Sequence, residues 1–147
     1  MKILKVRNVK TPSRGTSLSA GIDFFVPEDF EKTMVPPGVS LNIPSGIKVK
    51  LPHGYCLKLD NKSGVSIKTG LIVGATIIDE DYQGEVHLHV RNVGKEVETI
   101  TPGQKLVQGL LIPISYESVE EVNTVEELYQ GEVTQRGEGG FRSTGDK

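Results

Sequence analysis

Three acidic residues in a row interrupt an apolar segment in "TIIDEDYQGEV", residues 76–86. Side chains of a hairpin alternate between its faces, so Asp79 and Asp81 are expected on one face and Glu80 on the other. A carboxylate placed this way can orient a water molecule and accept its proton, provided that the water is held against its target. A solvated turn accounts for the same residues, and this stretch alone leaves both interpretations open.

Two other stretches carry residues that suit phosphate. "DNKSGVS", residues 60–66, joins a strand end to a short helix expected to open near Ser63, an acceptable N-cap residue. Backbone N–H groups at a helix N-terminus favour anions, although a simple turn is the alternative. "PGQKLVQG", residues 102–109, places Lys105 and Gln108 in an apolar strand, where Gln108 needs a partner from the core or from a ligand.

The ends of the chain add two further candidates. Asp23 stands between apolar neighbours in "SAGIDFFVPED", where a hydrogen bond to the backbone is the plainest role. The C-terminal "RGEGGFRSTGDK" lacks the Gly-Lys-Ser/Thr ending of a Walker loop. Its arginines suit phosphate and Phe141 suits a flat ring, so this segment could fold over a nucleotide. A disordered tail is the alternative.

The histidines and the single cysteine carry weaker signals. His87 and His89 share one strand face, as a metal pair would, but no third ligand accompanies them, which favours packing. Cys56 is the one cysteine, so an internal disulfide is impossible, and it is expected to be a small buried apolar residue.

Composition limits the class of protein. The chain has 147 residues, which suits one domain, and its formal net charge of −2 argues against a general nucleic-acid or membrane surface. No apolar run approaches the ~18 residues of a membrane span. The N-terminus, "MKILKVRNVK", has charges spread through it and does not resemble a signal peptide. We therefore expect a soluble cytoplasmic protein, or one of the host cytoplasm if its source is viral.

Apolar residues alternate with a period of two in "VSLNIPSGIKVKL", "YCLKL" and "EVHLHV", and "QKLVQGLLIPI" is a longer apolar strand. Turn residues separate these segments, which predicts an all-β jelly roll or distorted barrel of short strands. One short helix is expected in "KSGVSIKTGL". "TVEELYQ" has the spacing of a capping box for another helical turn. We expect residues 1–130 to form a nucleotide-binding core and residues 131–147 a flexible glycine-rich arm.

Taken together and in this order, five stretches resemble the motifs of the homotrimeric deoxyuridine triphosphatases, or dUTP pyrophosphatases. They are "AGIDFF", "KSGVSIKTGL", "IIDEDYQGEV", "PGQKLVQGLL" and "RGEGGFRSTG", and the resemblance runs from about Lys2 to Gly145. It implies a jelly roll, three subunits and three shared active sites. It also implies water attack on the α-phosphorus of dUTP, giving dUMP and pyrophosphate, which keeps uracil out of DNA and supplies dUMP. Mg²⁺ would be held chiefly by the triphosphate and water, so no protein metal ligand is expected.

The resemblance assigns roles to matching residues. Asp79 would orient the attacking water, Tyr82 would lie under the deoxyribose and block a 2′-hydroxyl, and Asp23 would support the catalytic hairpin. Phe141 would stack on uracil. Backbone groups of the hairpin would read the uracil edge, at Gly74, Thr76 and Ile78. The phosphates would be held by four core residues and three arm residues: Lys62, Ser63, Gly64, Gln108, Arg136, Ser143 and Thr144. The arm would close as a lid over a neighbouring subunit's site.

The sequence departs from the family pattern at three places. Asn61-Lys62 stands where the second motif usually has Pro-Arg, and lysine keeps the charge without the bidentate geometry of arginine. Lys105 stands where arginine is frequent. Arg142 replaces a glycine after Phe141, which restricts the backbone and adds a candidate phosphate contact.

Two rival functions remain at this stage. A deoxycytidine triphosphate deaminase shares the fold, but it needs a catalytic glutamate and a different third motif. A non-catalytic protein that acts through protein contacts is the other. Asp79 and Tyr82 favour catalysis over both rivals.

Overall fold

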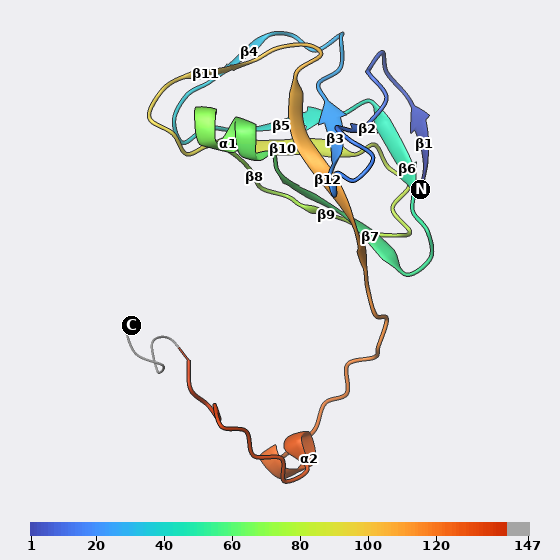
Figure 1. Cartoon of the computed structure of the whole chain (residues 1–147), viewed down its shortest axis with the longest axis vertical. Helices are drawn as coiled ribbons and strands as arrows, with labels where there is room; N and C mark the ends of the chain where they lie inside the picture. Colours follow the sequence, from blue (N-terminus) through green and yellow to red (C-terminus); the bar gives the residue numbers. More distant parts are fainter. Residues whose placement is uncertain (141–147) are drawn as a thin grey trace. The chain divides into compact units, whose positions relative to one another are not determined.

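We describe the structure from a computed structural model, which covers residues 1–140. Phe141, Arg142, Ser143 and Thr144 therefore lie outside the described residues, and their expected roles stay predictions. The chain divides into two compact units, Met1–Ser115 and the segment that starts at Tyr116 (Figure 1). This division falls earlier than the boundary near residue 130 expected from the sequence.

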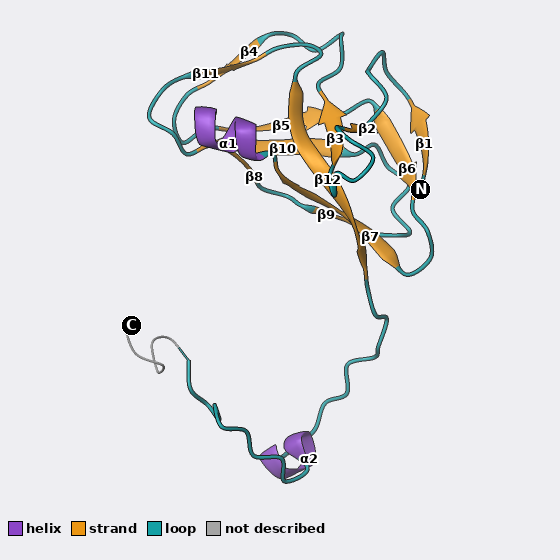
Figure 2. Cartoon of the chain, in the orientation of Figure 1, coloured by secondary structure: helices purple, strands orange, loops and turns teal. Residues whose placement is uncertain are grey.

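The first unit is built almost wholly of antiparallel strands, with one short helix (Figure 2). Its strands are β1 (Lys2–Lys5), β2 (Ser13–Arg14), β3 (Ile22–Phe25), β4 (Thr33–Val35), β5 (Ser40–Pro44), β6 (Ile47–Lys50), β7 (Tyr55–Asn61), β8 (Leu71–Val73), β9 (Ile77–Ile78), β10 (His87–Asn92), β11 (Glu98–Ile100) and β12 (Lys105–Pro113). The expected all-β fold is confirmed.

The strands form one larger sheet, one smaller sheet and two ribbons. The larger sheet has the order β2-β3-β12-β7-β9, and the smaller has the order β5-β10-β8. β1 pairs with β6, and β4 pairs with β11. In the larger sheet β12 lies between β3 and β7, so Gln108 stands opposite both Asp23 and Asp60 (Figure 1). Three of the stretches singled out in the sequence are therefore neighbours.

One hydrophobic cluster fills the first unit. The period of two is seen directly in β10 and the residue before it, where Val86, Leu88 and Val90 are buried. β3 differs, because all four of its residues are buried, including Asp23 at 4% exposure. Cys56 is buried, as expected.

Both expected helical turns are present. α1 (Ser63–Thr69) begins one residue after its N-cap, which is Lys62 and not Ser63 as the sequence suggested, and no side-chain cap is formed there. α2 (Val125–Tyr129) begins after Thr124, whose Oγ1 accepts a hydrogen bond from the N–H of Glu127. α2 belongs to the second unit. No helix within residues 1–140 is long and apolar enough to cross a membrane.

Candidate active site

The candidate residues of the first unit fall into two clusters, with Asp79 beside the Tyr55 end of β7 and Lys62 following its other end. We call Asp23, Lys62, Lys105 and Gln108 the cation cluster, because two lysines dominate it. We call the residues from Ala75 to His87 that line a cavity the hairpin cluster.

Asp23 is the centre of the cation cluster. Its Oδ1 lies 2.8 Å from Lys62 Nζ, and its Oδ2 lies 2.8 Å from Lys105 Nζ. Burial disfavours the charged carboxylate, but the hydrogen bonds and charges of Lys105 and Lys62 outweigh it, so the pKa of Asp23 lies below its ordinary value. One carboxylate facing two ammonium groups leaves one excess positive charge, which suits an anionic ligand. Asp23 thus holds these two lysines, and its support of the catalytic hairpin stays a prediction.

Gln108 finds the partner that its place in an apolar strand requires. Its Nε2 donates to the carbonyl of Asn61 at 2.8 Å. Gly21 makes room for it, because a Cβ at that position would overlap Gln108 Oε1. Asn61 in turn accepts a hydrogen bond on Oδ1 from the N–H of Val73 at 2.8 Å. The end of β7 is thereby tied to both β12 and β8.

Ser63 and Gly64 open α1 beside this cluster and are exposed. A Cβ added at Gly64 would meet no atom within 4 Å, so the space over the first turn is open. Space of this kind next to Lys62 is compatible with a phosphate contact at these two residues.

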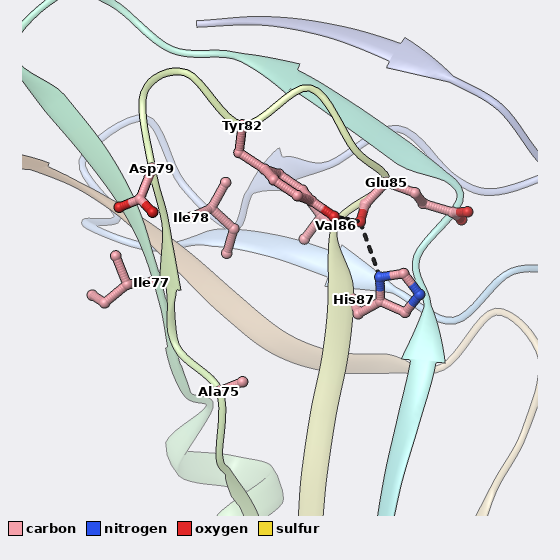
Figure 3. A pocket seen from close by; sticks show the side chains of 8 residues that line it. All are labelled: Ala75, Ile77, Ile78, Asp79, Tyr82, Glu85, Val86 and His87. Carbon is pink, nitrogen blue, oxygen red and sulfur yellow. Dashed lines mark hydrogen bonds between the residues drawn. The ribbon is translucent and has the colours of Figure 1, made fainter.

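The hairpin cluster follows directly after β9. Asp79 is exposed, and its carbonyl accepts a hydrogen bond from the N–H of Tyr82 at 3.2 Å, which closes the turn. A cavity of about 170 Å³ lies here (Figure 3). Its lining comprises Ala75, Ile77, Ile78, Asp79, Tyr82, Glu85, Val86 and His87.

Glu80 does not line this cavity, and neither does Asp81, which was expected on the same face as Asp79, because both residues lie in a turn after β9 ends. Its Oε2 accepts a hydrogen bond from the N–H of Gly54 at 2.8 Å, and its Oε1 lies 3.0 Å from His53 Nδ1. Glu80 therefore anchors the hairpin to the turn between β6 and β7. Asp79 and Glu85 are the two acids that line the cavity with Tyr82, and Asp79 is the exposed one.

The two histidines of β10 make packing contacts. His89 Nδ1 accepts a hydrogen bond from the N–H of Ala75 at 3.2 Å, and a Cβ on Gly74 would overlap the same nitrogen. His87 Nδ1 lies 2.9 Å from the carbonyl oxygen of Glu85. His89 thus shapes the turn at Gly74, where the uracil-reading hairpin is predicted.

A single first unit does not bring the two clusters together. The pairing of β7 with β9 places Leu57 opposite Ile78, so Asp79 lies near the Tyr55 end of β7. Lys62 follows the other end, and the strand from Leu57 to Lys62 extends over about 17 Å. Arg136 belongs to the second unit, where its Nε donates to the carbonyl of Gly139 at 2.7 Å.

The comparisons with known proteins agree with this geometry. A sequence model of the family described as dUTPase matches residues 7–145. The chain belongs to the dUTPase family. The deoxyuridine 5′-triphosphate nucleotidohydrolase of Mus musculus is 35% identical over 139 residues, which cover 91% of this chain and 77% of that protein. The protein of the same name from Anaplasma marginale is 34% identical over 150 residues, covering 99% of this chain and 97% of that protein.

A solved structure supports the fold. The dUTPase of Staphylococcus bacteriophage 80alpha, determined with dUPNHPP, is 25% identical to this chain with a TM-score of 0.83. The match covers 98% of this chain and 97% of that one. The jelly roll expected from the strand pattern is therefore the fold of this dUTPase family member.

The structure adds residues to which the sequence assigned no role in the site. Glu85 and Val86 line the cavity with Asp79, as do Ala75 and Ile77, and so does His87, which the sequence indicated only as a packing residue. Several of them lie inside or beside the third motif, so a wider reading of that motif would have included them. Their neighbour Arg7, which lies in an N-terminal segment without any motif, left no signal in the sequence.

Proposed function

We propose that Asp79 orients the water molecule with which this dUTPase family member hydrolyses dUTP to dUMP and pyrophosphate. The observation that carries the proposal is the position of Asp79. It is the exposed acid of the third motif that faces a cavity beside Tyr82, whereas Glu80 and Glu85 are held by protein groups. Water attacks the α-phosphorus, its proton passes to the Asp79 carboxylate, and the bond to the bridging oxygen of pyrophosphate breaks.

The remaining hairpin residues select the nucleoside in this proposal. Tyr82 lies under the deoxyribose and leaves no room for a 2′-hydroxyl. Backbone groups at Gly74, Thr76 and Ile78 read the uracil edge, so a thymine methyl is excluded by size and cytosine by its reversed donor and acceptor pattern. The close approach of His89 to Gly74 supports a rigid turn at this point.

The cation cluster binds the phosphate chain in this proposal. Lys62, Ser63, Gly64 and Gln108 contact the phosphates, and the lysines supply charge that Asp23 only partly neutralises. Cleavage of a phosphoanhydride depends chiefly on positioning and on charge neutralisation, which these groups provide. Arg136, Phe141, Ser143 and Thr144 of the arm complete the site, with Phe141 on the uracil ring.

The donor groups present suit Mg²⁺ that is carried by the substrate. Within residues 1–140 no group of three or more His, Cys, Asp or Glu gathers to hold a metal ion. Mg²⁺ usually keeps several waters and binds to substrate phosphates, so the triphosphate and water would hold it here, and Asp79 would serve the attacking water. When bound, the ion supplies charge neutralisation on the triphosphate.

The separation of the two clusters supports the proposal of a homotrimer with shared sites. About 17 Å of strand lies between the part of β7 beside Asp79 and the part beside Lys62, so one chain cannot supply both from adjacent positions. A second subunit that contributes its cation cluster, and a third that contributes its arm, would complete each site.

The decisive experiment is pyrophosphate release from dUTP, dTTP, dCTP and UTP with Mg²⁺ and the purified full chain. We expect release from dUTP alone. Ammonia from dCTP would indicate the deaminase. If no nucleotide is turned over but dUTP binds, the protein acts by binding. The first variants to make would then restore the usual family residues, arginine at Lys62 and glycine at Arg142.

A further inference from the structure

Glu85 lies where the hairpin returns toward β10, and its carboxylate is held from two sides. Oε1 accepts a hydrogen bond from Arg7 Nε at 2.9 Å and another from the N–H of Gly46 at 2.6 Å. The Glu85 side chain is 18% exposed and that of Arg7 is 39% exposed. In Figure 3 the Glu85 side chain extends away from the ring of Tyr82.

The backbone of the same residue holds Tyr82. The Tyr82 hydroxyl donates to the Glu85 carbonyl oxygen at 3.0 Å, and His87 Nδ1 lies 2.9 Å from that oxygen. Gly84 lets the tyrosine ring lie against the hairpin backbone, since a Cβ there would overlap the hydroxyl oxygen. Glu85 therefore links the two residues, because its carboxylate binds Arg7 and its backbone carbonyl binds Tyr82.

The turn between β5 and β6 makes this link rigid. Val6 donates to the Gly46 carbonyl at 2.8 Å, and the Val86 N–H donates to the Ile47 carbonyl at 2.8 Å. Gly46 has φ of 75°, and a Cβ on it would lie 2.9 Å from Arg7 Cβ, so the arginine stem packs over the turn. The Glu85 hydrogen bond raises the pKa of Arg7 above its ordinary value, which keeps the guanidinium charged.

We propose that Arg7 is a positioning residue for sugar selectivity, which acts through Glu85 on the ring of Tyr82. The inference rests on the proposed function, in which Tyr82 excludes a ribose 2′-hydroxyl. A single hydroxyl is excluded by steric clash, so the exclusion depends on a Tyr82 ring that is held firmly in place. Without the Arg7 bond, the Glu85 carbonyl loses one of its restraints, and Tyr82 can shift to admit UTP.

The test compares Arg7→Met with Asp29→Ala. Methionine retains the apolar stem over Gly46 and removes the guanidinium. Asp29 is the second, more distant partner of Arg7 at 3.6 Å, so its removal leaves the Glu85 bond intact. We would measure kcat and KM for dUTP and UTP, with thermal unfolding of each variant as a check on folding.

In Arg7→Met we expect the ratio of kcat/KM for dUTP to that for UTP to fall roughly three- to tenfold, chiefly through faster UTP turnover. The dUTP kcat should stay within about twofold of the wild type. In Asp29→Ala the ratio should be unchanged. In a Tyr82→Phe background, where the hydroxyl link is already absent, Arg7→Met should lower the ratio little further.

Four results would overturn the inference. If the wild type prefers dUTP and the Arg7→Met variant keeps the same ratio of kcat/KM values, Arg7 has no role in selectivity. The same conclusion follows if Arg7→Met lowers the ratio equally in the wild type and in the Tyr82→Phe background. In both cases the proposed function itself still stands. A wild type that releases no pyrophosphate from dUTP removes the proposed function and this inference together. If Arg7→Met fails to fold, Glu85→Gln weakens the same ion pair, and an unchanged ratio in that variant equally removes the role of Arg7.

Discussion

Asp23 is a buried carboxylate that pairs with two lysines, Lys62 at the N-cap of α1 and Lys105 at the start of β12. Because Lys62 and Lys105 bond to different carboxylate oxygens, the loss of the negative charge affects both at once. The structure therefore makes Asp23 a stabilising residue as well as an organiser of the cation cluster.

Replacing Asp23 by Asn should lower the free energy of unfolding by about 1–3 kcal/mol at pH 7, a range discounted for the exposure of the lysines. The folded pKa lies below the ordinary value of 3.8. The stabilisation is thus complete above pH 3.8 and is lost as pH falls through the lowered pKa. Urea unfolding at several pH values should show the gap to wild type shrinking below pH 3.8.

A matched control for this prediction is Asp60→Asn on β7, which β12 separates from β3 in the same sheet. Asp60 has one lysine partner, Lys58 at 2.8 Å, and is 34% exposed. Its loss should cost about 0–1 kcal/mol. If the difference in unfolding free energy between the wild type and Asp23→Asn stays constant down to pH 2, the stabilisation by Asp23 does not come from its charged pairs.

Asp79→Asn should reduce kcat for dUTP by about 10²–10⁴-fold, because the amide cannot accept the proton of the attacking water. Affinity for a non-hydrolysable dUTP analogue, measured by calorimetry, should stay within about threefold. Asp81→Asn is the control, since Asp81 is a neighbouring exposed acid outside the cavity lining. A kcat of the Asp79→Asn protein equal to that of the wild type would disprove the role of Asp79.

The candidate site illustrates what sequence patterns do and do not reveal. Asp79, Lys62 and Gln108 could be predicted from the sequence, because each interrupts an apolar strand or joins a strand to a turn. The hydrogen bond of Arg7 to Glu85 could not be predicted, since it joins residues from opposite halves of the chain. Such contacts depend on strand pairing and register, which local periodicity does not specify.

At the scale of elements, the alternating segments predicted β5, β6, β7 and β10 because each buries one face. Their order in the sheets was not predictable in the same way, since β12 pairs with two strands distant from it in sequence. The N-cap of α1 also differs from the prediction, by one residue. It is Lys62, whose side chain goes to Asp23 and makes no cap bond.

The junction from α1 to β8 is fixed by a glycine that cannot be replaced cheaply. Gly70 has φ of 70° and ends α1, and a Cβ on it would lie 2.7 Å from the backbone of Gly94. Gly70→Ala should therefore cost about 2–4 kcal/mol, as backbone strain and a clash add together. Denaturant unfolding at constant m-value measures this cost.

Gly38→Ala separates the two contributions. Gly38 has φ of 80°, but a Cβ there would meet nothing within 4 Å. Its replacement should cost about 1 kcal/mol from backbone strain alone. Equal costs at both glycines would show that the backbone at Gly94 moves aside, and that the α1–β8 junction is softer than its packing indicates.

At the scale of the whole molecule, the separated clusters predict complementation between two inactive chains. One chain carries Asp79→Asn and keeps its arm, and the other ends at Gln130 and keeps Asp79. Each alone should be inactive. If one subunit supplies Asp79 and another the arm, random mixed trimers should recover about a quarter of wild-type activity per site, because the two requirements are met independently.

The mixture should be made by unfolding and refolding the two chains together, and its mass checked by light scattering. The control replaces the shortened chain with one that also carries Asp79→Asn, which leaves no source of the carboxylate. A mixture as inactive as this control would mean that the arm serves the Asp79 of its own chain. Recovery instead places the arm across a subunit boundary, so that a complete site exists only in the assembly.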